Sequence, residues 1–457
     1  MKKRLSLLLI LCLVCFSLPA VADAPLVEPS GCKCYWNDGA YELGPRYEDI
    51  RWTSCESGDQ HGYVLLDDGT AEIVDMTYYG YWIPETVDGI PVTAIGTLGI
   101  CDRMDYPSEL EIPAWITQIS ENVLRWAYDK NLFVSVDPAN SCFSFENGIL
   151  FDLRNHCLLA YLENDSCVFP ADTEWIGCRA FEGCGFDRIE LPDGLTRIGD
   201  FAFEGCGSLT AIAIPDSITD IGDNPFIHCG SLTDIAISPD HPLYGFRDGI
   251  LYRKTDMQII CVLPAYAEGG WTMPEWAMSL GPYALSGITG LTEVRLHNGL
   301  TEIPQGTFLD CYDLTAIQLP DGIETIGAEA FSHCISLAEI DIPGSVRKIG
   351  LVAFAGCWSL KEVRFAEGPA EIRDAAFSRC EELRTVVLPR ELISIGSSAF
   401  FECHKLEEMA IPDSVTAIGY GAFSGCRSLT VTAGPDSTAA QYCLENHIPC
   451  VFSVNPE

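Results

Sequence analysis

The stretch IGAEAFSHC, residues 326–334, decides the fold because it returns along the chain at a fixed interval. Related stretches are IGLVAFAGC from residue 349, IGSSAFFEC from residue 395 and IGYGAFSGC from residue 418. The isoleucines that open these units follow one another every 23 residues: Ile303, Ile326, Ile349, Ile372, Ile395 and Ile418. An earlier block begins at Ile176, Ile198 and Ile221. Self-similarity at such a period is typical of repeat proteins, in which each unit stacks on the next.

The second half of each unit predicts a short β-strand. In the unit that begins at Ile326, Ile340 and Ile342 alternate with acidic residues, and Pro343 then ends the strand. A unit of 23 residues is too short to bury its own apolar face, so its neighbours must cover it. Equivalent strands then pair in parallel, about 4.8 Å apart. The sequence therefore predicts an α/β-type repeat, a solenoid of 23-residue coils with a parallel β-sheet on one face.

A phenylalanine and a cysteine recur at fixed places in the same units. The two series, three residues apart, are Phe331, Phe354, Phe377, Phe400 and Phe423, and Cys334, Cys357, Cys380, Cys403 and Cys426. Stacked coils would place equivalent Cβ atoms about 4.8 Å apart on parallel bonds, whereas a disulfide needs about 3.5–4.5 Å and converging bonds. Zinc sites need local clusters of converging ligands. We therefore predict ladders of buried rings and free thiols, and no disulfide, redox or metal array. The glycine after each isoleucine indicates either a tight approach or a positive φ.

Two segments break the period. They lie between Ile119 and Ile176 and between Ile221 and Leu280, and they contain the related stretches NGILFDLRNHCLLAY (147–161) and DGILYRKTDMQIICVL (248–263). We interpret each segment as about two coils that carry a β-hairpin. Asp248-Gly249 and the earlier Asp67-Asp68-Gly69 are expected to be hairpin turns, because neither continues into a calcium-binding loop.

The first residues have the composition of a secretory signal. Three cationic residues, 2–4, precede an apolar run over 5–18, and Ala20 and Ala22 offer a small-residue cleavage site. The run is short for a membrane span, so we expect cleavage after Ala22 and no membrane insertion afterwards. The predicted organisation is a signal peptide (1–22), an N-terminal cap region (23–94), a solenoid (95–430) and a C-terminal cap (431–457). Within the solenoid, regular coils span 176–235 and 280–430, and irregular coils span 120–175 and 236–279.

The charge of the chain excludes some partners. There are 65 acidic and 27 basic residues, and the formal net charge is −38. Nucleic acids and anionic membrane surfaces attract basic proteins, so neither is expected to bind. A hydrophobic content of 48% is too high for a disordered acidic chain. These values fit a self-repelling, secreted, monomeric protein.

Few residues outside the repeat pattern suggest a chemical site. Cys32, Cys34 and Cys55 favour one structural disulfide, such as Cys34–Cys55, over a metal site, because no histidine accompanies them. Cys443 and Cys450 leave open whether a disulfide closes the C-terminal cap. There is no G-x-S-x-G motif and no evident pair of catalytic carboxylates. The aromatic residues in TYYGYW (77–82), with Trp271 and Trp276, are expected to cover the core, although they could form a sugar-stacking patch. We therefore predict no enzyme, no catalytic residue, no cofactor and no metal.

The repeat resembles the leucine-rich-repeat family in its BspA-like bacterial surface variant. The resemblance rests on IGAEAFSHCISLAEIDIPGSVRK (326–348) and its sister units, on residues 63–96 at the entry and on STAAQYCLENHIPCVFSV (437–454) at the end. It implies a secreted or cell-surface solenoid that binds a protein or glycan on a host or bacterial surface. It carries no catalytic residue and names no ligand. The sorting motif or membrane tail that many members carry is not evident here.

The strand positions that flank the inward isoleucines vary from unit to unit, whereas the core positions do not. A repeat scaffold leaves such positions available for recognition. We predict that they form the partner-binding face: Glu293, Arg295, His297, Gln318, Glu339, Asp341, Glu362, Arg364, Thr385 and Glu408. The arginines and His297 are expected either to contact the partner or to pair with nearby carboxylates. The alternatives to an adhesion-type protein are a carbohydrate-active or peptidase accessory protein and a structural spacer of the cell envelope.

Overall fold

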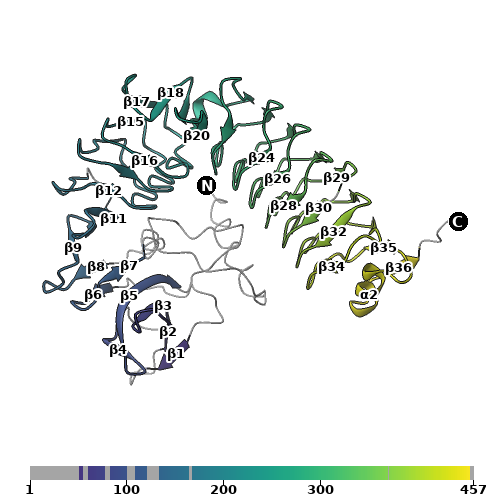
Figure 1. Ribbon diagram of the computed structural model, residues 1–457, viewed down its shortest axis with the longest axis horizontal. Coiled ribbons are helices and arrows are strands. Elements are labelled where there is room, and N and C mark those ends of the chain that lie inside the picture. Colours follow the sequence, from purple (N-terminus) through teal and green to yellow (C-terminus); the bar gives the residue numbers. More distant parts are fainter. Residues whose placement is uncertain are drawn as a thin grey trace, which may run out of the picture.

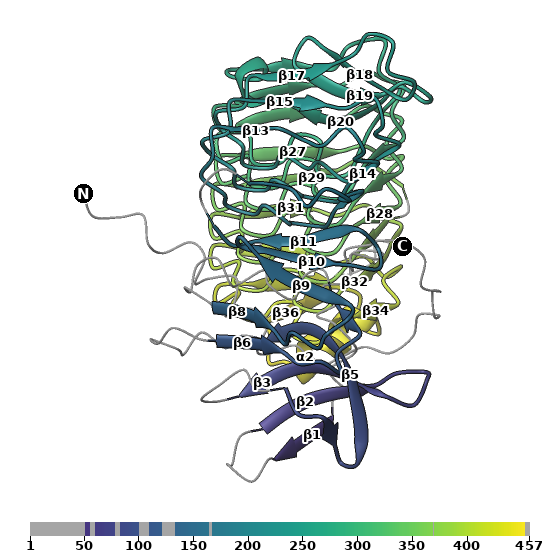
Figure 2. The ribbon, with the colours of Figure 1, turned by 90° about the vertical axis from the view of Figure 1, so that its left-hand side faces the viewer.

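The computed structural model describes residues 51–54, 60–77, 83–99, 109–120, 133–163, 167–368 and 370–452. The described coils stack into a curved solenoid that forms an arc, with the N-terminal strands at one end and the C-terminal helix at the other (Figure 1). A view turned by 90° shows the strands layered one above another (Figure 2). The predicted signal peptide, the cysteines Cys32, Cys34 and Cys55, and most of the aromatic run at 78–82 lie outside the described residues.

Each regular coil contributes two short strands and a run of turns. The strands that end in the unit's opening isoleucine form one parallel sheet, here called the first sheet: β24 (Glu302–Ile303), β26 (Thr325–Ile326), β28 (Lys348–Ile349), β30 (Ala370–Ile372), β32 (Leu392–Ile395) and β34 (Ala417–Ile418). The predicted I-x-I strands form another, the second sheet: β27 (Glu339–Ile342), β29 (Glu362–Phe365), β31 (Thr385–Val387), β33 (Glu408–Ala410) and β35 (Thr430–Ala433). β36 (Cys450–Phe452), from the segment predicted as the C-terminal cap, extends this sheet. The parallel sheet of I-x-I strands is thus confirmed, while the first sheet was not predicted, since most of its strands are two or three residues long and show no alternation.

The same two-sheet arrangement runs through the earlier coils in shorter blocks. On the side of the first sheet lie β12 (Trp175–Ile176), β14 (Arg197–Ile198) and β16 (Asp220–Ile221), and on the side of the second sheet lie β13 (Arg188–Ile189), β15 (Ala211–Ile214) and β17 (Asp234–Ile237), followed by β21 (Trp271–Thr272), β23 (Glu293–Arg295) and β25 (Ala316–Gln318). The described part of these repeats contains no α-helix; the third side of each coil is made of turns. The repeat is therefore a β-solenoid.

The turns between the two sheets hold the phenylalanine and cysteine of each unit; we call them the Phe-Cys turns. Phe354 lies fully buried between Phe331 and Phe377, with ring centroids 5.0 and 5.1 Å apart and nearly parallel planes. The Cys357 thiol donates a hydrogen bond of 3.1 Å to the carbonyl of Phe331 in the preceding coil. The same bond recurs from Cys206, Cys229, Cys334, Cys380, Cys403 and Cys426.

The ladder cysteines are free thiols, as the stacking geometry predicted. Burial raises the pKa of the Cys357 thiol, which keeps it protonated and able to donate. The recurring cysteine therefore serves the architecture: a small buried side chain with one weak donor meets a carbonyl of the neighbouring coil.

The glycine that follows each opening isoleucine permits a close approach between coils. A Cβ on Gly350 would lie 2.5 Å from the backbone nitrogen of Ala328, and Gly327 and Gly396 are equally crowded by backbone. Of the two sequence-based explanations, the tight approach applies here. Positive φ occurs elsewhere, at the residue before the ladder cysteine, for example at Asp310, His333 and Arg379 (φ 58° in each).

Both irregular segments contain antiparallel hairpins that join the first-sheet side. In the earlier segment, β9 (Phe143–Glu146), β10 (Ile149–Asp152) and β11 (Cys157–Tyr161) lead into β12. In the later segment, β18 (Tyr244–Arg247), β19 (Ile250–Arg253) and β20 (Gln258–Val262) lead into β22 (Ser279–Leu280), and the 3-10 helix η2 (Pro264–Tyr266) follows β20. The hairpin turns predicted at 67–69 and 248–249 are confirmed by the pairing on either side of them.

The described chain begins with a series of strands and ends with a helix followed by the strand β36. The first strands are β1 (Arg51–Ser54), β2 (Gln60–Leu65), β3 (Ala71–Thr77), β4 (Thr86–Val87), β5 (Ile90–Gly99), β6 (Glu109–Ile112), β7 (Gln118–Ile119) and β8 (Phe133–Val136). At the other end, the helix α2 (Thr438–Glu445) packs Ala439 and Cys443 into the core. Cys443 and Cys450 are free thiols, so the disulfide that the sequence left open is not formed.

Candidate binding face

The outward residues of the I-x-I strands lie on one side of the solenoid, here called the binding face. Along β27, β29, β31 and β33 the inward residues Ile340, Val363, Val386 and Met409 are at most 5% exposed, while their flanking side chains point to solvent. Strand register then aligns the predicted residues in a column: Glu339, Glu362, Thr385 and Glu408. A neighbouring column holds Asp341 beside Arg364. The structure therefore brings six of the predicted residues together on four adjacent strands.

Arg364 pairs with three carboxylates of this face. Its guanidinium nitrogens lie 2.5 Å from Asp341, 2.7 Å from Glu362 and 3.1 Å from Glu339. The hydrogen bonds to Asp341 and Glu339 raise the pKa of Arg364 further above its ordinary value. Of the two roles that the sequence allowed for this arginine, pairing within the face is the one that the structure contains.

Arg295 and His297 are also engaged within the protein. Arg295 lies 3.0 Å from Glu293 on the same strand. His297 lies beyond the end of β23 and is half-buried, so its prediction as an exposed strand position was wrong. One ring nitrogen lies 2.8 Å from the carbonyl of Ala277, and the other accepts a hydrogen bond from the backbone of Gly299. The ring thus stabilises a turn.

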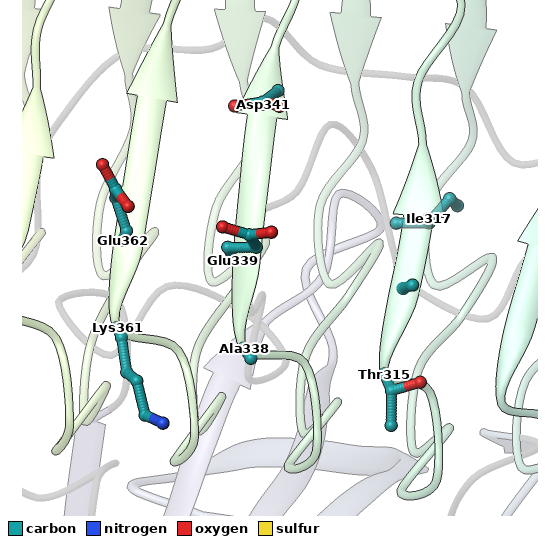
Figure 3. Close-up of a pocket in the computed structure, with 8 residues that line it drawn as sticks. Thr315, Ile317, Ala338, Glu339, Asp341, Lys361 and Glu362 are labelled. Atoms are coloured by element: carbon teal, nitrogen blue, oxygen red, sulfur yellow. The ribbon is translucent and has the colours of Figure 1, made fainter.

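A hollow on this face lies over β25, β27 and β29, at the place where the strand pairing stops between β25 and β27. β25 ends the sheet that contains β21 and β23, and β27 begins the next sheet, without a paired register between them. The hollow is lined by Thr315, Ala316, Ile317, Ala338, Glu339, Asp341, Lys361 and Glu362 (Figure 3). Sequence reasoning missed it, because AIQ in β25 has the same apolar alternation as its sister strands. No signal in the repeat marks the break.

A cluster of ionisable groups lies at the Phe-Cys turns. The Asp310 carboxylate is 2.9 Å from His333 and 3.5 Å from His228. Burial of Asp310 opposes ionisation, but hydrogen bonds from His228 and His333 outweigh it and hold the pKa of Asp310 well below its ordinary value. The described residues contain no group of histidine, cysteine or acidic side chains arranged to hold a metal ion. The cluster joins coils and is not a candidate metal centre.

The aromatic residues expected at the later irregular segment belong mainly to the core. Trp271 is 6% exposed, and Trp276 is half-buried against Tyr252, with ring centroids 4.7 Å apart. Packing therefore accounts for both tryptophans. Across the described ranges, no helix is long and apolar enough to cross a membrane.

The repeat pattern has a known counterpart. The family described as the BspA type leucine rich repeat region (6 copies) matches residues 154–254, 271–383, 301–430 and 370–446, which together are more than half of the chain. The chain belongs to this family. The BspA-like resemblance read from the repeat units is thereby confirmed, together with the leucine-rich-repeat solenoid. No curated protein is significantly similar to the chain in sequence.

One solved structure of a bacterial leucine-rich repeat protein shares the fold, and two others align less closely. A leucine-rich repeat protein from Eubacterium ventriosum aligns with a TM-score of 0.52 at 21% identity, covering 80% of this chain and 92% of that one. A leucine rich cell surface protein from Faecalibacterium prausnitzii aligns at 24% identity with a TM-score of 0.43, covering 74% and 94%. The pneumococcal vaccine antigen PcpA aligns at 17% identity with a TM-score of 0.44, covering 88% and 99%.

Proposed function

We propose that this BspA-type chain is an exported, non-enzymatic binding protein that presents the binding face to a protein or glycan on a host or bacterial surface. The observation that carries the proposal is the contrast within each coil. The inward positions of β27, β29, β31 and β33 stay apolar, and the phenylalanine and cysteine of the Phe-Cys turns recur. The outward position that follows each inward residue differs in every coil and is at least partly accessible: Asp341, Arg364, Val387 and Ala410. Variation confined to an exposed, rigid surface is what a repeat scaffold uses for recognition.

Export is supported by the signal-like residues 1–22 and by the family. The Faecalibacterium relative is described as a cell surface protein, which is the location that we propose for this chain as well. The large negative charge of −38 favours solubility and repels polyanions.

The test is a capture experiment with the mature chain against matrix proteins, mucins and bacterial envelope extracts. A face variant, Thr385→Arg with Glu408→Arg, places two bulky cations on β31 and β33. Its matched control, Thr301→Arg with Glu324→Arg, makes the same two kinds of substitution at exposed residues beside the first sheet. We expect the face variant to lose the captured partner and the control to retain it, with both melting as the parent does. Equal capture by all three proteins would refute the binding face, and capture of nothing would favour the structural spacer.

A further inference from the structure

We infer that the hollow over β25, β27 and β29 is a docking site for a lysine side chain of a basic protein partner. The inference rests on the proposed function and names the chemistry that the binding face selects. It is carried by the floor of the hollow, by the free oxygens of its carboxylates and by the charge of the chain.

The floor of the hollow is apolar. Ile317 occupies the inward position of β25, and it is half-buried, whereas Val294 and Ile340, its counterparts on the neighbouring strands, are each 1% exposed. The core therefore reaches solvent at Ile317, beside the small side chains of Ala316 and Ala338. An apolar surface of this kind is matched by a hydrocarbon stem, which loses water on contact.

The rim of the hollow is carboxylate. Glu339, Asp341 and Glu362 each give one oxygen to Arg364: Oε2, Oδ1 and Oε2, respectively. Their other oxygens accept no hydrogen bond from the described residues. Arg364 thus fixes three carboxylates in place and leaves one acceptor on each of them for a ligand. An ordered acceptor set costs less conformational entropy on binding than mobile side chains would.

A lysine side chain complements both the apolar floor and the carboxylate rim of the hollow. Its four-carbon stem packs along apolar surface while its ammonium group, with three donors, stays at the polar edge. Lys361 already borders the hollow, but its side chain runs toward the turn and away from Asp341 (Figure 3). Three carboxylates against Arg364 and Lys361 leave the rim with an excess of negative charge, within a chain of net charge −38. This charge attracts basic proteins and speeds their association.

The test is fluorescence anisotropy with the mature chain and a labelled peptide in which three lysines alternate with serines. A second peptide carries acetyl-lysine at the same places, which keeps the stem and removes the charge. The hollow variant is Glu339→Gln with Glu362→Gln. The matched control is Glu302→Gln with Glu324→Gln, which removes the same charge from exposed residues at the first sheet.

We expect saturable binding of the lysine peptide, and a loss of roughly tenfold or more in the hollow variant, since a hydrogen bond to a charged group is worth that much. The control should change affinity less than about threefold, as general charge screening predicts. Equal losses in the two variants, equal affinity for the acetylated peptide, or no saturation with the parent chain would each overturn the docking site. If a captured partner is lost on Thr385→Arg with Glu408→Arg but is insensitive to the hollow variant, the proposed function stands and the lysine site fails.

Discussion

The Phe-Cys turns and the binding face belong to the same coils, yet they carry different constraints. At the turns, the phenylalanine and the cysteine of each coil must match both the preceding and the following coil. Phe354 touches a ring on each side, and Cys357 reaches back to a carbonyl of the coil before it. On the face, Arg364 meets solvent and a few neighbouring carboxylates. The comparison shows that repetition is enforced where a coil is covered on both sides, and relaxed where it meets water.

The largest effect should follow from breaking the ring ladder. Phe354→Ala removes a fully buried ring between two stacked neighbours, and buried Phe→Ala changes typically cost about 3–5 kcal/mol. Urea unfolding followed by circular dichroism should show this loss and a split transition, because the fault lies between two runs of coils. Tyr420→Ala, at a side chain 73% exposed, is the control and should change little. A single cooperative transition at the parent's midpoint would contradict the ladder.

The close approach of the coils gives the next test. Gly350→Ala would place a methyl group 2.5 Å from the Ala328 nitrogen, so the backbone must shift. Overpacking of this kind costs about 1–3 kcal/mol. Gly230→Ala is the matched control, because a Cβ there meets nothing within 4 Å. Equal midpoints for the two variants in thermal melts would show that the coils are not packed as tightly as described.

The histidine-flanked carboxylate predicts a pH-dependent term at the turns. Because the pKa of Asp310 is lower in the folded chain than in the unfolded chain, ionised Asp310 stabilises the fold at pH values above the ordinary carboxyl pKa. This stabilisation is lost as the pH falls through the pKa that Asp310 has in the folded chain. Asp310→Asn should therefore destabilise by about 1–3 kcal/mol near neutral pH. The difference in free energy of unfolding between the variant and the parent should narrow when the urea titrations are repeated from pH 6 toward pH 3. Asp321→Asn, at an exposed residue, is the control, and a difference that stays constant with pH would disprove the assignment.

Removing one thiol from the cysteine ladder should lower the stability of the fold by less than the changes above. Cys357→Ala removes a buried sulfur and its hydrogen bond to Phe331, a loss of about 1–2 kcal/mol. Thiol labelling sharpens this test. In the native parent the ladder cysteines should resist alkylation, and after denaturation without a reductant they should react. Failure to react in denaturant would mean that the thiols are held in disulfides.

The smallest effect belongs to the binding face. Arg364→Ala should change stability by less than about 1 kcal/mol, because exposed ion pairs contribute little. His297→Ala is predicted to cost more than Arg295→Ala, since His297 bonds two backbone groups and Arg295 pairs only with Glu293 at the surface. The melting temperatures of the three variants compare how much a turn residue and two face residues contribute to stability. The opposite order would place His297 back on the face.

Much of the fold could be predicted from the spacing alone. The recurrence of Ile326, Phe331, Cys334 and Ile340 indicated stacked coils, a parallel sheet and free thiols, because a 23-residue unit has no other way to bury these side chains. The first sheet escaped prediction, since strands such as β26 are two residues long. The spacing predicted the outward placement of the strand residues, but the pairing of Arg364 with three carboxylates depends on which rotamers and neighbours meet, and spacing does not encode that.

The sequence by itself therefore determined the repeat, its stacking and the sign of its charge, since these follow from periodicity and composition. Only the tertiary structure decided that the glycines serve close approach, that the cysteines meet carbonyls of the preceding coil, and that the second sheet is interrupted between β25 and β27. The physical reason is that a regular pattern specifies what every coil has in common. A break in pairing arises from the fit of one coil on the next, and that fit decides how much of Ile317 stays exposed.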